Sequence, residues 1–302
     1  MILWEPGTYK RREDGDMYGL FCENYNETYS TLHGESSHDF HRFFALSYTI
    51  HNTVFDKAAY DRMMQIVKQK TTRFSALRSR YTPLLISHIQ LNSPEPERLL
   101  ERVIEAERHI KRRFIKEKAV RPFFALGEVL NREQGIDAFP IVEQLRQTRP
   151  VLNLAKQYVV TSTLMEGENL PERFIETVEQ AERWLERWMK PSSERLMTAQ
   201  ILAASKSIDS QKKRIQAWCE MMEERELRIW DRIFPLLALL ETTERVDMIY
   251  VTRVVDRERS RNRFSDEVNW LIAFHLLLAK SGKSRLQSAL LILATLELTK
   301  KP

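Results

Sequence analysis

Glycine is scarce in this chain, and its scarcity excludes several classes of fold. The 302 residues include eight glycines, and four of them fall before residue 35. Phosphate-binding loops and tight hairpins need glycine, because only glycine enters positive φ freely and lets a ligand approach the backbone closely. The composition therefore argues against a Rossmann domain, a P-loop domain and a β fold rich in hairpins.

Cysteine and long apolar runs are also scarce. Cys22 and Cys219 are the two cysteines, which is too few for the disulfide framework of a small secreted domain. The opening residues contain no apolar segment typical of a signal peptide. The longest apolar runs, 233–240 and 270–279, are shorter than the roughly 20 residues that span a bilayer. We therefore expect a cytoplasmic protein with no membrane partner.

The common catalytic and metal-binding motifs are missing as well. The chain has no Gly-x-Ser-x-Gly, no His-Glu-x-x-His and no Cys-x-x-Cys. Histidines gather between residues 33 and 51, but Glu35 and His38 form a single Glu-x-x-His, whereas a carboxylate di-iron bundle needs two. We therefore expect no catalytic residue, no metal and no cofactor, and the sequence favours a protein that is not an enzyme.

Helical periodicity dominates the chain after residue 40. In segment 96–114, apolar residues recur three and four positions apart, which is typical of an amphipathic helix. Serine, asparagine or aspartate stands before many such segments, where its side chain can accept a hydrogen bond from the first helical turn. No segment alternates convincingly as a strand does, so we predict an all-α fold. The expected helices cover 17–31, 39–51, 57–70, 76–91, 96–114, 119–131, 138–147, 151–166, 171–189, 193–206, 210–224, 227–241, 244–259, 266–280 and 285–298.

Three pairs of segments resemble each other within the chain. Residues 96–112 and 171–187 share nine identities in 17 aligned positions, at an offset of 75. Segments 57–75 and 247–265 resemble each other at an offset of 190. Pro83 and Pro235 each precede two leucines, at an offset of 152. All three offsets are near multiples of about 38 residues, a length typical of one helical hairpin in repeat proteins.

These observations predict an array of about seven helical hairpins that together form an α-superhelix, similar in architecture to HEAT or TPR proteins. We expect a tail over residues 1–16 and a single helical repeat domain over 17–302. The alternative is a globular helical array in which the internal similarity is coincidental.

Basic residues recur near the ends of the expected helices, and the chain has a formal net charge of +5. In a stacked array they would form a positive stripe that could neutralise phosphates. The alternative is a solvated rim, because lysine and arginine stabilise helix C-termini and pair with acidic residues four positions away. Trp184 and Trp188, one turn apart, suggest an aromatic contact surface, with core packing the alternative for Trp188. The candidate partner-binding residues are Arg73, Arg112, Arg113, Trp184, Arg187, Arg261 and Arg263.

Several segments also resemble a known family. The residues that carry the resemblance are Glu23-Asn24-Tyr25, the run Phe74-Ser75-Ala76-Leu77-Arg78-Ser79, and the helix over 96–114 with its repeat at 171–189. Together they are similar to a bacterial family catalogued as domain of unknown function 4003. The resemblance implies a cytoplasmic bacterial protein and transfers no catalytic residue.

Three functions are consistent with these patterns. The first is a helical-repeat interaction protein without enzymatic activity that binds a protein or peptide partner. The second is nucleic-acid binding through the basic stripe. The third is a DNA-acting enzyme built from helical repeats, similar to HEAT-like DNA glycosylases, which would need an aromatic residue, a carboxylate and arginines in one cleft.

Overall fold

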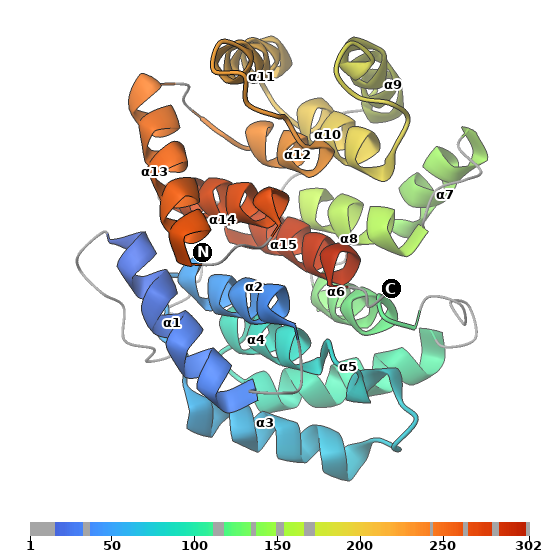
Figure 1. Ribbon diagram of the computed structural model, residues 1–302. Helices are drawn as coiled ribbons and strands as arrows, with labels where there is room; N and C mark the ends of the chain where they lie inside the picture. Colours follow the sequence, from blue (N-terminus) through green and yellow to red (C-terminus); the bar gives the residue numbers. More distant parts are fainter. Residues whose placement is uncertain are drawn as a thin grey trace. The chain divides into compact units, whose positions relative to one another are not determined.

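The computed structural model describes residues 16–32, 37–110, 118–133, 137–148, 154–165, 173–241, 244–261, 265–279 and 284–299. Over these ranges the chain forms helices and no strand, which confirms the predicted all-α class (Figure 1). The expected tail over 1–16 lies almost wholly outside the described residues. The α-helices are α1 (Met17–Leu32), α2 (His38–Thr49), α3 (Lys57–Lys70), α4 (Thr82–Asn92), α5 (Pro96–Ile110), α6 (Arg121–Glu133), α7 (Phe139–Thr148), α8 (Leu154–Met165), α9 (Phe174–Leu185), α10 (Ser193–Ala203), α11 (Ile208–Glu223), α12 (Phe234–Leu237), α13 (Arg245–Arg261), α14 (Asp266–Ala279) and α15 (Ser284–Leu298).

Two expected helices are each divided into a 3₁₀ turn and a later, shorter helix. The expected helix over 76–91 is a 3₁₀ turn, η1 (Ala76–Arg78), followed by α4, and the one over 227–241 is a 3₁₀ turn, η2 (Asp231–Ile233), followed by α12. Pro83 and Pro235 lie in the first turns of α4 and α12. Proline has no N–H and disfavours a helical residue before it, so it starts a helix more readily than it continues one.

The chain divides into two compact units. Unit 1 comprises residues 1–135 and 291–302, and unit 2 comprises residues 136–290. Helix α15 therefore contributes its first residues to unit 2 and its last ones to unit 1. The expectation of a single domain over 17–302 stays a prediction.

Within each unit, consecutive helices pack as hairpins. In unit 1 the pairs are α1 with α2, α3 with α4, and α5 with α6; in unit 2 they are α7 with α8, α9 with α10, α11 with α12, and α13 with α14. Successive hairpins contact each other through their even-numbered helices: α2 packs on α4 and α4 on α6 in unit 1. In unit 2, α8 packs on α10, α10 on α12, and α12 on α14.

The helices differ in burial, and the difference follows from their residues. From Phe40 to Thr49 every residue of α2 is buried, and so is every residue of α14 from Glu267 to Leu278. Helix α5 instead buries one stripe that includes Leu100 and Val103. A helix that is apolar on all sides is stable only when covered, whereas an amphipathic helix covers others with one face. Helices α2 and α14 are therefore covered on all sides, as are residues 287–296 of α15, while α5 covers its neighbours with one face.

Among the described residues, no helix combines the length and the apolar character needed to span a bilayer.

Candidate partner-binding surface

The structure describes four of the seven candidate partner-binding residues. Arg73, Arg187 and Arg261 are exposed, and Trp184 is half-buried. Arg112, Arg113 and Arg263 lie outside the described residues. Two of these four residues, Trp184 and Arg187, lie together at the end of α9.

Trp184 and Arg187 belong to a cluster of rings and cations that we call the α9 cluster: Trp184, Arg187, Trp188, Lys212 and Phe234. The ring centroids of Trp184 and Trp188 are 4.7 Å apart with an interplanar angle of 71°. The guanidinium carbon of Arg187 lies 4.5 Å from the Trp184 ring and 4.0 Å from the Trp188 ring. Lys212 Nζ lies 5.7 Å from the Trp184 ring. One guanidinium is therefore held by two indole faces.

The helices around the α9 cluster explain why its members meet. Trp184 is in the last turn of α9, and the Trp188 N–H donates to the Leu185 carbonyl over 3.0 Å, so the helical turn continues past the end of α9. This spacing places residues 184 and 188 on one face, with Arg187 beside them. Trp188 also packs on Phe234 of α12, with ring centroids 6.3 Å apart, and α11 supplies Lys212.

The charges of the α9 cluster are available to a partner. Arg187 is exposed, and among the ion pairs of the described residues none involves Arg187 or Lys212. An exposed cation–π contact is worth about 0.5–1 kcal/mol, enough to orient a guanidinium without consuming its N–H donors. Because the stacked guanidinium presents its N–H groups at its edge, it can bind a carboxylate with two parallel hydrogen bonds.

A second group of cations lies where α3 and α5 end together in unit 1. Arg108 Nη2 donates to the Lys70 carbonyl over 3.0 Å, and Lys70 Nζ lies 2.5 Å from Glu101 Oε1. Arg78 Nη2 donates to the Thr71 carbonyl over 2.6 Å. Basic residues near the ends of two expected helices are therefore neighbours. Their side chains are already engaged, because Lys70 pairs with Glu101 and because Arg78 and Arg108 donate to backbone carbonyls at the end of α3.

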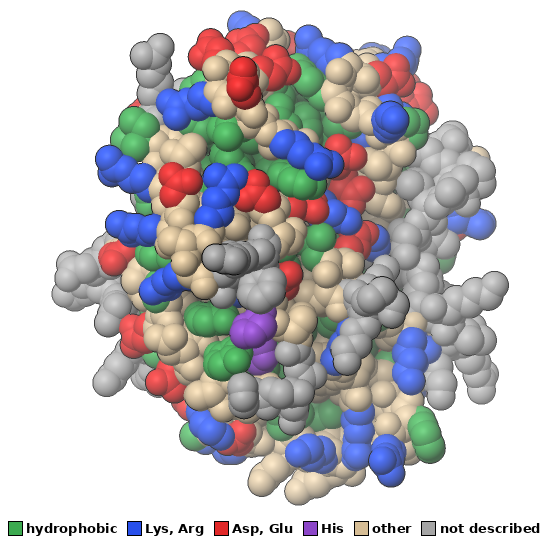
Figure 2. Space-filling model, in the orientation of Figure 1, with side chains coloured by type: hydrophobic (Ala, Val, Ile, Leu, Met, Phe, Trp, Pro, Cys, Tyr) green, Lys and Arg blue, Asp and Glu red, His purple; other side chains and the backbone are tan. Residues whose placement is uncertain are grey.

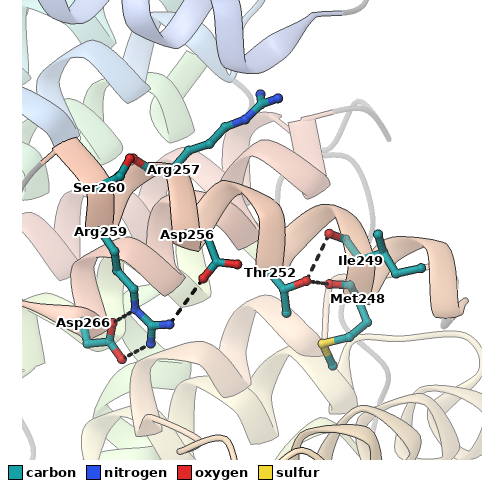
Figure 3. Close-up of polar contacts among 8 residues, drawn as sticks. All are labelled: Met248, Ile249, Thr252, Asp256, Arg257, Arg259, Ser260 and Asp266. Carbon is teal, nitrogen blue, oxygen red and sulfur yellow. Dashed lines mark hydrogen bonds and ion pairs between the residues drawn. The ribbon is translucent and has the colours of Figure 1, made fainter.

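Surface charge elsewhere is mixed. Figure 2 shows lysine and arginine gathered over the end of α3 but interleaved with acidic side chains over most of the face in view. In unit 2, Arg259 Nε and Nη2 each donate to Asp266 over 2.7 Å, and Arg259 Nη1 lies 3.5 Å from Asp256 (Figure 3). The hydrogen bonds from Arg259 hold the pKa of Asp266 below its ordinary value. This arginine joins the end of α13 to the start of α14 and is not available to a phosphate.

The buried thiol and imidazoles show no sign of catalytic activation. Burial raises the pKa of the Cys219 thiol to about 12, so the nucleophilic thiolate is not populated at neutral pH. Burial lowers the pKa of His88 and of His275 to about 3, so both rings are neutral at physiological pH. Near the N-terminus, the Tyr25 hydroxyl lies 3.3 Å from His38 Nδ1, and the Tyr29 ring stacks on the His38 ring.

The residues that carried the family resemblance have structural roles. Asn24, fully buried, donates to the Thr53 carbonyl over 2.9 Å and accepts from the Phe55 N–H over 2.8 Å, which ties α1 to the loop before α3. In the second motif, Ser75 Oγ accepts from the Leu77 N–H over 3.2 Å and starts η1, and Arg78 terminates α3. These motifs specify joints of the helical array.

Sequence reasoning missed Lys212 and Phe234 in the α9 cluster. Neither carries a local signal, because each lies on another helix far along the chain and meets the tryptophans only through tertiary packing.

The comparison with known families finds that residues 24–299 match the model described as "Protein of unknown function (DUF4003)". No curated protein and no solved structure matches the chain.

Proposed function

The chain belongs to the DUF4003 family, and from this premise we propose that it is a non-enzymatic interaction protein that binds an acidic peptide segment of a protein partner through the α9 cluster. The observation that carries the proposal is the Arg187 guanidinium held over Trp184 and Trp188 at 4.5 and 4.0 Å in an exposed position. Tryptophan and arginine are the residues most enriched at the energetic centres of protein interfaces.

The chemistry of the α9 cluster sets the class of peptide. Two indole rings offer apolar area at low entropy cost, and Arg187 and Lys212 supply two positive charges beside them. The complementary segment carries aspartate or glutamate next to an apolar side chain. The carboxylate would bind the edge of the Arg187 guanidinium, while the apolar group packs on the accessible part of the indole rings.

Nucleic-acid binding remains the alternative proposal, and the contacts favour it less. Arg78, Arg108 and Arg259 already donate to carbonyls or to Asp266, so they would have to exchange those bonds for phosphates. A DNA-acting enzyme is a further alternative, with no residue of established catalytic role to support it.

We also propose that the hairpins form one continuous α-superhelix of the HEAT or TPR type. The proposal is supported by the stacking of even-numbered helices within each unit and by the three internal similarities, each of which pairs two odd-numbered helices or two even-numbered ones. A superhelix predicts a radius of gyration well above the roughly 19 Å of a compact chain of this length. Small-angle X-ray scattering measures it, and a value near the compact one would contradict the superhelix.

Arg187→Ala and Trp184→Ala are expected to weaken the binding of a short synthetic peptide of alternating glutamate and leucine by about tenfold and thirtyfold. These factors correspond to about 1.4 and 2 kcal/mol, which are ordinary values for arginine and tryptophan at an interface centre. The dissociation constant is measured by fluorescence anisotropy of the labelled peptide, with an otherwise identical peptide of alternating glutamine and leucine for comparison.

The matched control is Arg80→Ala, which removes the same charge and the same kind of contact in unit 1, since Arg80 lies 4.8 Å from the Tyr81 ring. Its affinity for the glutamate peptide should equal that of the parent protein. The proposal fails if the glutamine peptide binds equally well, or if Arg80→Ala weakens binding as much as Arg187→Ala. Tighter, salt-sensitive retention of a single-stranded oligonucleotide would favour the nucleic-acid alternative.

A further inference from the structure

Exposed large hydrophobic side chains occur at only two places within the described residues. Phe74 in unit 1 is 87% exposed, and on α13 in unit 2 Val246 is 60% and Ile249 40% exposed. Aromatic side chains, phenylalanine included, are enriched in the buried cores of protein interfaces. Neither place belongs to the α9 cluster, although Arg73, which precedes Phe74, is one of the sequence-predicted partner-binding residues.

The Phe74 tip, as we call residues 72–75 between α3 and η1, is a rigid protrusion. The Ser75 N–H donates to the Thr72 carbonyl over 3.0 Å and closes a tight turn with Phe74 at its apex. On its far side the turn is held by η1, because Ser75 Oγ accepts from the Leu77 N–H over 3.2 Å. Phe74 is thus presented outward by a hydrogen-bonded turn.

The surroundings of Phe74 are basic. Arg73 precedes it and is exposed, and Lys68 on the last turn of α3 is also exposed. Among the ion pairs of the described residues, neither Arg73 nor Lys68 takes part in one. The tip therefore combines one protruding aromatic ring with positive charge that no nearby carboxylate neutralises.

The α13 patch, which we define as Val246 and Ile249, is apolar with an acidic border. The two residues are three positions apart and so lie on one face of α13, while Met248 and Val251 are buried on the other. Figure 3 shows Ile249 and Met248 on different sides of the helix. Exposed Glu241 and Glu244 precede the patch, Asp247 Oδ2 accepts from the Glu244 N–H over 3.2 Å, and exposed Arg253 follows Ile249 by one helical turn, so the acidic residues lie at the N-terminal end of the patch.

The basic Phe74 tip and the acidic N-terminal end of the α13 patch complement each other. Two Phe74 tips would bring like positive charges together, which disfavours contact between two tips. A tip against a patch instead joins an apolar ring to an apolar face and places Arg73 near Glu244. We propose that the Phe74 tip of one copy of this chain docks on the α13 patch of a second copy, in a head-to-tail self-association.

Head-to-tail geometry has a consequence that distinguishes it from a symmetric dimer. Each copy keeps one free tip or one free patch after the first contact, so the association continues to larger species or closes into a ring. Because one side chain and a few charges make the contact, the association is weak and depends on protein concentration. Sedimentation velocity over a wide concentration range is the suitable measurement.

The deciding experiment mixes two variants that are each damaged on one surface. Phe74→Asp keeps the patch, and Ile249→Asp keeps the tip; both positions are exposed, so both variants should retain the parent's circular dichroism spectrum. Each variant alone is expected to sediment as a monomer at concentrations where the parent protein associates. Their equimolar mixture is expected to form dimers and nothing larger, because one intact tip and one intact patch remain.

Charge exchange tests the pairing of Arg73 with Glu244. Arg73→Glu and Glu244→Arg are each expected to weaken self-association about tenfold, and the double variant is expected to recover it. Arg98→Glu, an exposed charge change on α5, is the control that should leave association unchanged.

Four results would overturn the proposal. They are a parent protein that stays monomeric throughout the concentration range, a Phe74→Asp variant that associates like the parent, a mixture that forms no dimer, and an association that disappears after nuclease treatment. The last would show that the tip binds nucleic acid. Acidic-peptide binding should be unaffected by Phe74→Asp, so failure of self-association and failure of the proposed function are separate outcomes.

Discussion

Glu107→Ala is expected to lower the free energy of unfolding by about 3–5 kcal/mol. Glu107 of α5 lies 2.5 Å from Arg121 Nε of α6, and each side chain is 5% exposed. Removing the carboxylate leaves a guanidinium buried without its counter-charge, and the desolvation cost of that charge is no longer offset. Urea unfolding followed by circular dichroism at 222 nm measures the loss.

The same helix provides a matched control for Glu107. Glu101 on α5 lies 2.5 Å from Lys70 Nζ, but the two side chains are 49% and 47% exposed. Water and salt screen such a pair, so Glu101→Ala should lower the free energy of unfolding by less than about 1 kcal/mol. Equal losses for the two variants would contradict the argument that burial decides the cost. The double variant Glu107→Met/Arg121→Met should recover most of the stability, because it leaves no unpaired charge.

Asn24→Leu is also expected to have a large effect, lowering the free energy of unfolding by roughly 2–4 kcal/mol. The Asn24 side chain is fully buried and makes three hydrogen bonds: to Thr49 Oγ1 over 3.1 Å, to the Thr53 carbonyl, and from the Phe55 N–H. Leucine has a similar size but leaves the carbonyl and the N–H without their partner in the interior. The loss of stability is measured as a shift of the urea midpoint.

Asn92 is the control for this substitution. It is half-buried at the end of α4, where its Nδ2 donates to the His88 carbonyl over 2.7 Å. Water can replace that bond, so Asn92→Leu should cost less than about 1 kcal/mol. If Asn24→Leu is no more costly than Asn92→Leu, then Asn24 does not anchor the loop after α2, and its place in the family motif needs another explanation.

Capping residues and apolar periodicity are local signals, and they predict where many of the helices begin. Asp56 Oδ1 accepts from the Ala59 N–H at the start of α3, and Ser192 Oγ accepts from the Arg195 N–H at the start of α10, as capping residues should. The two shortened helices show where this reasoning erred. Apolar periodicity runs through 76–91 and 227–241, but Pro83 and Pro235 impose a new helix start, and the backbone restriction on proline outweighs periodicity.

The α9 cluster was predicted only in part. Spacing alone places Trp184 and Trp188 one turn apart, and Arg187 between them. It does not say that Lys212 approaches Trp184 or that Trp188 packs on Phe234, because these contacts join α9 to α11 and α12. Spacing also did not predict the role of each basic residue. Arg187 contacts aromatic rings and Arg259 binds a carboxylate, although both occupy similar positions in the helical pattern.

The amino-acid sequence by itself determined the helical class and the starts of capped helices such as α3 and α10, because periodicity and capping act within a few residues. The tertiary structure alone decided which charges are neutralised and which apolar groups stay uncovered. Lys70 has Glu101 beside it and Arg187 has two indoles, while Phe74 is left 87% exposed. Those outcomes depend on which helices pack together, and that information lies in contacts between residues distant in the chain.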